Sequence, residues 1–524
     1  MRRNHSLGFG IAATVLASLA LFGACGRNGD PVLDSPPGDD GGLNSGQPDG
    51  GLPDSGSPDG GAPDGGGPPD GGPPDGGVPD GGRPDGGTDG GVIITFPDAG
   101  GWTFYGTQNG GPQMVHGVTS DASGNIWVAG GTEGLFLLKP GETRFHRYTM
   151  ADGLRPYGYM PDGGAPPGEK YLSVLSVAGG PAGTVFAGYE GKPVPSGVAD
   201  CESNWDSEHP DPSIYKSGDA DRVTLQAGDR ISVVHYDIFT GPGLIADELR
   251  GREKLCTIRR IAYHAASNSV WFGGNHGFAW GQANYQGNPT CDGQYECSGV
   301  LEHSHPAING CADETPSCRP DHVYLFTGEY FGVAPLPNGD VWFGGANRST
   351  LFLYGTYGYN WWQAGHDVEC ASCIANRIDV WPDAVGEPGI PTPSQRLDDN
   401  VSDMAVMPDG SVWIGSFTNG LAHYTRGRPT EFRHDTLIDP RGNAVGLELD
   451  STDGSLWIGY SYGGLAKLNG NIYTPYDYRV LGPDLTQGWI PDIQSDNFGG
   501  HRRLLVAFGG GGGKPGAIGI YIGP

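Results

Sequence analysis

A short phrase of residues recurs between positions 101 and 524 of this chain, and it limits the folds that the chain can adopt. In its clearest copy the phrase reads Asp409-Gly410-Ser411-Val412-Trp413-Ile414-Gly415, a turn followed by an apolar segment with a central Trp. Variants of the apolar segment occur at seven places, which are residues 125–130, 184–188, 269–273, 340–344, 411–415, 455–459 and 503–507. Such long-period repeats are typical of architectures in which each unit buries its apolar face only against its neighbours.

The spacing around each copy predicts antiparallel strands. An apolar residue lies nine or ten residues before the central aromatic in most copies, as Val118 does before Trp127, and turn formers such as those at 121–124 lie between them. Most copies continue with Gly-Leu and a third apolar segment, and the clean copies have a fourth. Four antiparallel strands repeated radially form a β-propeller. We therefore predict an all-β fold, a seven-bladed β-propeller in which each Trp packs between blades.

The two ends of the repeat region predict how the ring closes. The last copy stops after its third strand, at residues 517–521, and lacks a fourth. The segment Trp102-Thr103-Phe104-Tyr105-Gly106 has the aromatic spacing of a fourth strand. We predict that this N-terminal strand completes the seventh blade and hides the unpaired edge of the last sheet.

The first copy contains a set of residues that is similar to a known repeat. These residues are Val118, Asp121, Gly124-Asn125-Ile126-Trp127-Val128, Gly134-Leu135, Phe145, Tyr148-Thr149 and Asp152-Gly153-Leu154. The pattern resembles the two-component regulator propeller repeat, which builds the periplasmic sensor propellers of hybrid histidine kinases, and it is strongest in copies one, five and six. The resemblance implies a sensor-type propeller for an oligosaccharide or protein ligand. We expect this chain to lack a kinase or other output domain of its own.

The N-terminus predicts export and a lipid anchor. Arg2-Arg3 precedes an apolar run from Leu7 to Ala24, and small residues precede Cys25, as in a secretory signal. The segment before Cys25 resembles a bacterial lipobox, although Phe22 stands where a smaller residue is usual. We predict a lipoprotein signal peptide at 1–24 and lipidation of Cys25, with an uncleaved membrane anchor or an ordinary cleaved signal as alternatives. Gly26 after the Cys favours the outer membrane, so we expect the cell envelope as the location.

Residues 25–100 predict a disordered tether. Pro-Asp-Gly-Gly recurs from Pro48 to Gly87, and the stretch from 30 to 100 holds fourteen Asp with almost no large apolar residues. Such a segment cannot offset the entropy lost on ordering, so we predict a stalk that lifts the propeller off a membrane. A calcium-binding repeat is the alternative, but calcium loops need several oxygens that converge at fixed offsets.

The charge balance excludes one class of partner. The chain has a formal net charge of −29 at pH 7. Nucleic-acid binding needs clustered Lys and Arg for the phosphates, so we expect no nucleic-acid partner. The acidity is better explained by solubility and low self-association, which favours a monomer.

Three predicted insertions interrupt the repeats, near 189–222, 281–320 and 355–400. Seven of the eight cysteines besides Cys25 lie in or beside them. We predict disulfides in this exported chain, and one connectivity pairs Cys201 with Cys256, Cys291 with Cys297, Cys311 with Cys318 and Cys370 with Cys373. The alternative is zinc at Cys370-Ala-Ser-Cys373, or at the cysteines of 291–318 with His303 and His305. We expect no metal or other cofactor.

The candidate binding residues lie inside the apolar pair of each predicted first strand, where a strand that only filled a core would be apolar. They are His116, Arg259, Arg260, Ser402, Asp403 and Asp492. We predict that they face the mouth of the central channel, with solvent-facing strand ends as the alternative. A second candidate surface is the aromatic cluster of the 355–400 insertion, which suits sugar stacking or a protein contact and consists of Tyr357, Tyr359, Trp361 and Trp362.

These observations favour a binding or sensing propeller in the envelope, with a glycan or protein as ligand. Propeller enzymes of the lyase or hydrolase type and a structural envelope protein are the alternatives. The Gly-x-Ser-x-Gly pattern of a nucleophile elbow occurs at residues 459–463, in Gly459-Tyr460-Ser461-Tyr462-Gly463, but no helical pattern follows it. The Gly-rich stretch before Lys514 lacks the Ser or Thr of a phosphate loop, because Pro515 takes that place. We found no catalytic constellation and expect no enzyme activity.

Overall fold

The computed structural model places most of the region after residue 100. The residues that it describes are 101–158, 165, 168–195, 199–203, 217–238, 255–286, 300–304, 307–309, 323–325, 329–345, 348–353, 358–363, 401–417, 420–424, 433–434, 444–461, 464–470, 472–476, 489–511 and 513–522. The predicted signal peptide at 1–24, the lipidation site Cys25 and the tether at 25–100 lie outside the described residues. None of the helices in the described ranges has the length and apolar character needed to cross a lipid bilayer.

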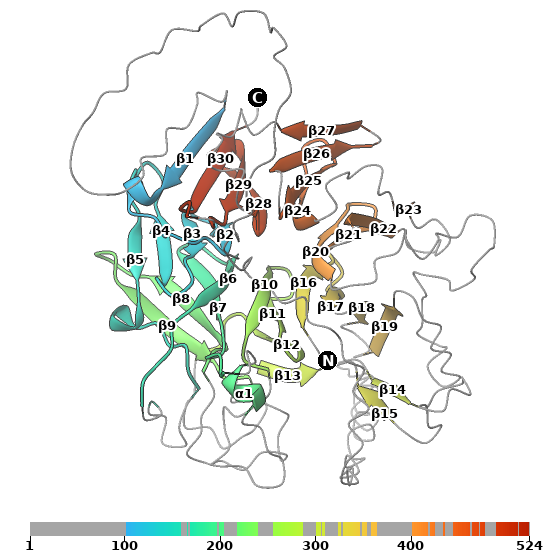
Figure 1. Ribbon diagram of the computed structural model, residues 1–524, viewed down its shortest axis with the longest axis horizontal. Coiled ribbons are helices and arrows are strands. Elements are labelled where there is room, and N and C mark those ends of the chain that lie inside the picture. The colour runs from blue at the N-terminus through green and yellow to red at the C-terminus, as the bar shows by residue number, and fades with distance from the viewer. Residues whose placement is uncertain are drawn as a thin grey trace, which may run out of the picture. The chain divides into compact units, whose positions relative to one another are not determined.

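The described strands form seven four-stranded antiparallel sheets and one two-stranded sheet (Figure 1). In sheets 1 to 4 the strands lie side by side in chain order. Sheet 1 consists of β2 (Gly117–Ser120), β3 (Ile126–Ala129), β4 (Leu135–Leu138) and β5 (His146–Tyr148). Sheet 2 consists of β6 (Val174–Gly179), β7 (Thr184–Tyr189), β8 (Ala220–Leu225) and β9 (Ile231–Tyr236). Sheet 3 consists of β10 (Ile258–His264), β11 (Ser269–Gly274), β12 (Gly277–Gln282) and β13 (Val300–Ser304). Sheet 4 consists of β16 (Tyr330–Pro335), β17 (Val341–Gly345), β18 (Arg348–Leu353) and β19 (Gly358–Gln363).

Sheets 5 and 6 repeat this order, and sheet 7 departs from it. Sheet 5 consists of β20 (Val401–Val406), β21 (Val412–Ser416), β22 (Gly420–Tyr424) and β23 (Arg433–His434). Sheet 6 consists of β24 (Ala444–Asp450), β25 (Ser455–Tyr460), β26 (Leu465–Asn469) and β27 (Ile472–Tyr476). Sheet 7 has the order β28 (Asp492–Phe498), β29 (His501–Phe508), β30 (Ala517–Ile522) and β1 (Trp102–Gly106). The smaller elements are η1 (Thr107–Asn109), η2 (Met150–Asp152), α1 (Asp200–Ser203) and the pair β14 (Ala307–Asn309) with β15 (Val323–Leu325).

The first strands of the sheets stand around a common centre. Figure 1 shows β2, β6, β10, β16, β20, β24 and β28 toward the middle, with the later strands of each sheet further out. Each of these inner strands contacts the next one along the chain, and β28 contacts β2. A ring of antiparallel sheets whose first strands surround a channel is a β-propeller, so the predicted all-β propeller fold is confirmed.

The recurring aromatic packs where the sequence predicts, between neighbouring sheets. Trp127 is fully buried and belongs to a cluster that also holds Val174 and Val185 of sheet 2. Trp457 likewise packs with Ile490 and Leu504 of the sheet 7 region. Each indole covers apolar surface that one four-stranded sheet could not bury alone. The Trp residues of the phrase are therefore part of the scaffold.

In three sheets an Asp or Ser a few residues before the Trp accepts a hydrogen bond from its indole N–H. Asp121 accepts hydrogen bonds from the indole N–H of Trp127 (2.8 Å), the side-chain amide of Asn125 (2.8 Å) and the backbone N–H of Ser123 (2.7 Å). Asp450 and Ser269 accept the indole N–H of Trp457 and Trp271 in the same way. In these three sheets the Asp or Ser thus satisfies a polar group of the buried indole.

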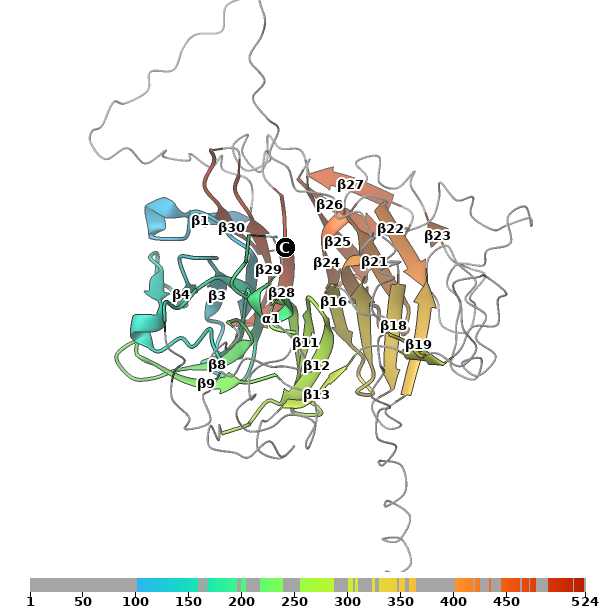
Figure 2. The same cartoon turned by 60° about the horizontal axis from the view of Figure 1, so that its bottom comes forward.

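The N-terminal strand closes the ring as predicted. β1 pairs antiparallel with β30, with Trp102 opposite Tyr521 and Gly106 opposite Ala517. Phe104 is 8% exposed and packs with Phe508, while Trp102 stacks beside it. Figure 2 shows β1 beside β30. The last sheet is therefore built from both ends of the repeat region, which removes one exposed strand edge.

Two predictions about the insertions can be compared with the described residues. Cys201 and Cys256 form a disulfide, as the predicted connectivity has it, and both are buried. Cys291, Cys297, Cys311, Cys318, Cys370 and Cys373 lie outside the described residues. The aromatic cluster needs a correction: the backbone of Tyr359, Trp361 and Trp362 forms β19, the fourth strand of sheet 4, and Tyr357 lies outside the described residues. Three of these residues therefore belong to a blade strand, which the sequence pattern does not separate from the predicted insertion.

Candidate binding site at the central channel

Five of the inner strands carry the same irregularity near their first residue. The ladder between first and second strands shifts register after Val174, Ile258, Tyr330, Val401 and Ala444. A β-bulge of this kind leaves one residue out of the pairing and turns its side chain away from the regular alternation. The residues so displaced are Leu175, Arg259, Phe331, Ser402 and Val445.

All five displaced residues line one opening of the channel, a cavity of about 140 Å³ that we call the bulge-side mouth. Five of the six predicted channel residues line it as well: His116, Arg259, Arg260, Ser402 and Asp492. The sixth, Asp403, faces a larger cavity of about 610 Å³, which we call the turn-side cavity because the hairpin turns of the inner strands surround it. The structure thus brings the six residues together around the channel axis.

The bulge-side mouth also contains aromatic residues that the sequence reasoning missed. They are Phe331, Phe417 and Trp489. Phe331 and Phe417 meet edge to face at 4.9 Å, and the Arg259 guanidinium lies 5.5 Å from the Phe331 ring centre. The ring centres of His116 and Trp489 lie 6.1 Å apart. Burial lowers the pKa of His116. Phe331 occupies the position of Arg259 and Ser402 in its own strand, so aligning the copies would have identified it.

A charged contact lies between the two cavities, because Arg260 lines both of them. Arg260 donates to Asp492 (2.7 Å) and lies 3.2 Å from Asp403. Both carboxylates are also bound by backbone of the next sheet, because Val118 N–H donates to Asp492 (2.9 Å) and Leu447 N–H to Asp403 (2.9 Å). The network connects sheets 3, 5, 6, 7 and 1. Removing one of its partners would leave a buried charge without compensation and would lower the free energy of unfolding. These three residues therefore have an evident structural role.

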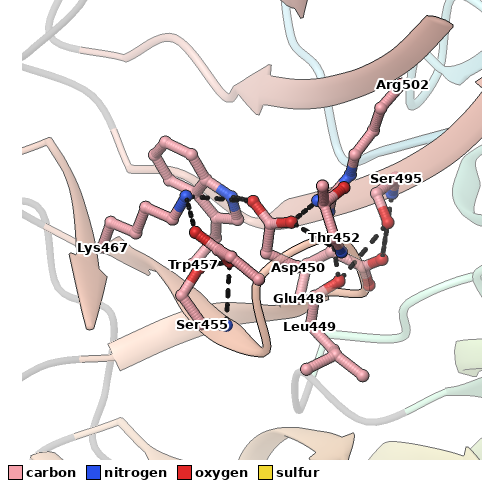
Figure 3. A network of polar contacts seen from close by, with 10 residues as sticks. Glu448, Leu449, Asp450, Thr452, Ser455, Trp457, Lys467, Ser495 and Arg502 are labelled. Atoms are coloured by element: carbon pink, nitrogen blue, oxygen red, sulfur yellow. Dashed lines mark hydrogen bonds and ion pairs between the residues drawn. The ribbon is translucent and has the colours of Figure 1, made fainter. Parts of the chain in front are cut away.

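The turn-side cavity holds two carboxyl groups with unusual proton affinity. Burial raises the pKa of Glu448 to about 8; hydrogen bonds from Ser495 oppose the rise, and the charge of Asp492 adds to it. Burial also raises the pKa of Asp403 to about 6, against the opposing effect of Arg260. Figure 3 shows Ser495 of β28, in sheet 7, beside Glu448 of β24, in sheet 6. The backbone N–H and the hydroxyl of Ser495 donate to the Glu448 carboxylate, at 3.0 and 2.5 Å.

The charged side chains next to Glu448 in Figure 3 form ion pairs with one another. Asp450 lies between Lys467 and Arg502 and accepts the Trp457 indole N–H (Figure 3). This side of the blade is neutralised by its own ion pairs. Glu448 is therefore the group in this network whose charge state is open to change near neutral pH.

Metal-ligating groups lie elsewhere. Within the described ranges, two sets of His, Cys, Asp or Glu side chains come close enough to share an ion, and neither lines an opening of the channel. One contains Asp200 with Cys201 and Cys256, whose sulfurs are joined in the disulfide. The other consists of Asp219, His235 and Asp237 in sheet 2.

Comparisons with known proteins identify no family. No protein-family profile and no curated protein matches the chain. Among solved structures, YCF48 bound to D1 peptide aligns with a TM-score of 0.41 and 10% identity, over 82% of this chain and 98% of that one. The extracellular domain of the hybrid two-component system BT3049 from B. thetaiotaomicron aligns with a TM-score of 0.39 and 12% identity, over 80% of this chain and 41% of that one. The resemblance to the two-component regulator propeller repeat stays a prediction.

Proposed function

We propose that this chain is a ligand-binding propeller with its seven sheets as blades, and that its ligand docks over the bulge-side mouth. The observation that carries the proposal is the bulge that five inner strands share. Arg259, Phe331 and Ser402 are the displaced residues of three different strands, and all three line one opening.

The chemistry of the mouth suits a glycan or a protein segment. Aromatic rings beside an Arg are the residue types that dominate protein hot spots, and ring faces also stack on sugars. The Arg259 side chain is 28% exposed while it pairs with Glu329 at 2.6 Å, so a carboxylate or hydroxyl of a ligand can reach it. Binding in place of turnover is favoured because Arg260, Asp403 and Asp492 already hold neighbouring sheets together.

The test is binding of the purified full chain to glycan and peptide arrays, followed by titration of each hit. Phe331→Ala and Arg259→Met should each weaken binding at least tenfold, because each removes a contact at the centre of the mouth. Ile472→Ser is the matched control, since Ile472 is 70% exposed on the outer strand β27. Hits that bind both mouth variants as tightly as the wild type would refute this site.

For the cellular context we propose export and lipid anchoring through Cys25, with residues 25–100 as a stalk and the outer membrane as the location. The support is the sequence pattern alone. Cys25→Ser should abolish incorporation of labelled fatty acid and move the chain from the membrane to the soluble envelope fraction. Equal labelling of the variant would refute the anchor.

A second candidate function is catalysis in the turn-side cavity, and one observation favours it. A carboxyl whose pKa is about 8 keeps its proton near neutral pH and can serve as a general acid. A lyase or hydrolase acting on glycans would then lose activity in Glu448→Gln. Unchanged turnover in that variant, or turnover lost equally in Ile472→Ser, would exclude the role.

A further inference from the structure

The outer hairpin of sheet 2 brings four ionisable side chains close together. β8 and β9 pair antiparallel with Asp221 opposite His235. Asp219 lies directly before β8 and Asp237 directly after β9, and their carboxylates come close to the histidine of that pair. All four residues are buried, with exposed fractions of 4% or less.

Asp221 determines which nitrogen of the histidine carries the proton. Its carboxylate accepts the backbone N–H of Arg155 (2.7 Å) and the hydroxyl of Tyr189 (2.5 Å). The other oxygen of Asp221 lies 2.8 Å from Nδ1 of His235. An ionised carboxylate can only accept, so Nδ1 carries the proton, and a metal ion at Nε2 would take the place of a second proton on the ring.

Nε2 of the histidine faces two carboxylates at a separation that fits a shared ion. Nε2 of His235 lies 3.9 Å from Asp219 Oδ2 and 3.9 Å from Asp237 Oδ1. These distances exceed hydrogen-bond length, and they are shorter than the sum of two zinc–ligand bonds, roughly 4.1 Å. The three ligand atoms all lie within 4.8 Å of one another.

We propose that Asp219, His235 and Asp237 bind a divalent metal ion, with Asp221 as the residue that orients the histidine. Two carboxylates and a neutral imidazole supply a charge of −2, which matches a divalent cation. A ligating histidine whose other nitrogen donates to a carboxylate is the usual arrangement around such ions. One nitrogen and two oxygens suit zinc or manganese better than calcium, which takes oxygen ligands.

The surroundings indicate a structural ion. The side chains of the three ligands are 5% exposed or less, so the site has no opening for a substrate. The backbone N–H of Asp219 donates to the carbonyl of Cys256 (2.7 Å), which belongs to the Cys201–Cys256 disulfide. The ion would therefore cross-link the strand ends of β8 and β9 next to a covalent cross-link.

The test uses the full chain, expressed for export without an affinity tag, stripped with a chelator and then loaded with Zn²⁺ or Co²⁺. Free thiols are alkylated first, so that cysteines outside the disulfide take no metal. We expect one equivalent of zinc after desalting, a visible absorption band for the cobalt form, and a higher melting temperature for the loaded chain than for the stripped one. His235→Gln and Asp237→Asn should lose the bound ion and the shift in melting temperature.

The control is His501→Gln, a change at an exposed histidine of β29 that should keep one equivalent. A wild-type chain that takes up no ion and melts alike with and without zinc would overturn the proposal, and this outcome needs no variant to fold. Full retention of zinc in His235→Gln and Asp237→Asn would overturn it too. Because the site lies outside the channel, neither result bears on ligand binding at the bulge-side mouth.

Discussion

Replacing Glu448 with Gln should change how the stability of this propeller depends on pH. Glu448 faces the turn-side cavity and has a pKa of about 8 against an ordinary value of 4.5, mainly because of burial. The folded state therefore binds a proton more tightly than the unfolded state. The stability that this proton contributes is complete below about pH 4.5 and is lost progressively as the pH rises through about 8. Gln keeps the shape and the acceptor for Ser495 but cannot ionise.

The magnitude follows from the pKa difference. A rise from 4.5 to about 8 corresponds to about 5 kcal/mol at most. Glu448 is half-buried and lines the turn-side cavity, so solvent screens its charge and we expect about 2–3 kcal/mol. Asp403, whose pKa is raised to about 6, titrates in both proteins, so its contribution largely cancels in the difference.

The assay is chemical denaturation of wild type and Glu448→Gln at several values between about pH 5 and about pH 9, with the disulfide intact. The variant should be slightly less stable than the wild type at the acid end and clearly more stable at the alkaline end. Glu169→Gln is the control, because Glu169 is exposed, and it should run parallel to the wild type. A constant difference between Glu448→Gln and the wild type across this range would refute the reasoning.

Three further perturbations test the scaffold. Phe104→Ala should lower the free energy of unfolding by about 3–5 kcal/mol, because Phe104 is buried against sheet 7, and an unchanged thermal melt would refute closure by β1. Replacing Cys201 and Cys256 together with Ser should cost about 2–4 kcal/mol in denaturant titrations, and reducing agent should then have no further effect at this site. Asp121→Ala leaves the Trp127 indole and the Asn125 amide without their acceptor and should cost about 1–3 kcal/mol, while Asp152→Ala, at an exposed 3₁₀ turn, should cost less.

The sequence alone was sufficient for the scaffold. The strand periodicity, the turn residues before Trp127 and its counterparts, and the missing last strand are local signals, each repeated several times along the chain. Repetition averages out the ambiguity of any single copy, and it is why the pairing of Trp102–Gly106 with the last sheet could be predicted across more than four hundred residues. The Cys201–Cys256 pair could be proposed as well, although spacing left other connectivities open.

The tertiary structure decided where the chemistry lies. The polar residues inside the apolar pairs predicted Arg259 and Ser402 at the channel mouth, but the bulges that turn them and Phe331 toward one opening depend on the pairing of two strands. Phe417 and Trp489 come from segments that follow a second strand or precede an inner one, and only the closed ring brings them together. Asp-x-Asp at 219–221 and His-x-Asp at 235–237 were visible as letters in the sequence. These two pairs of residues come together only through the register of β8 against β9, and register is a property of the paired strands.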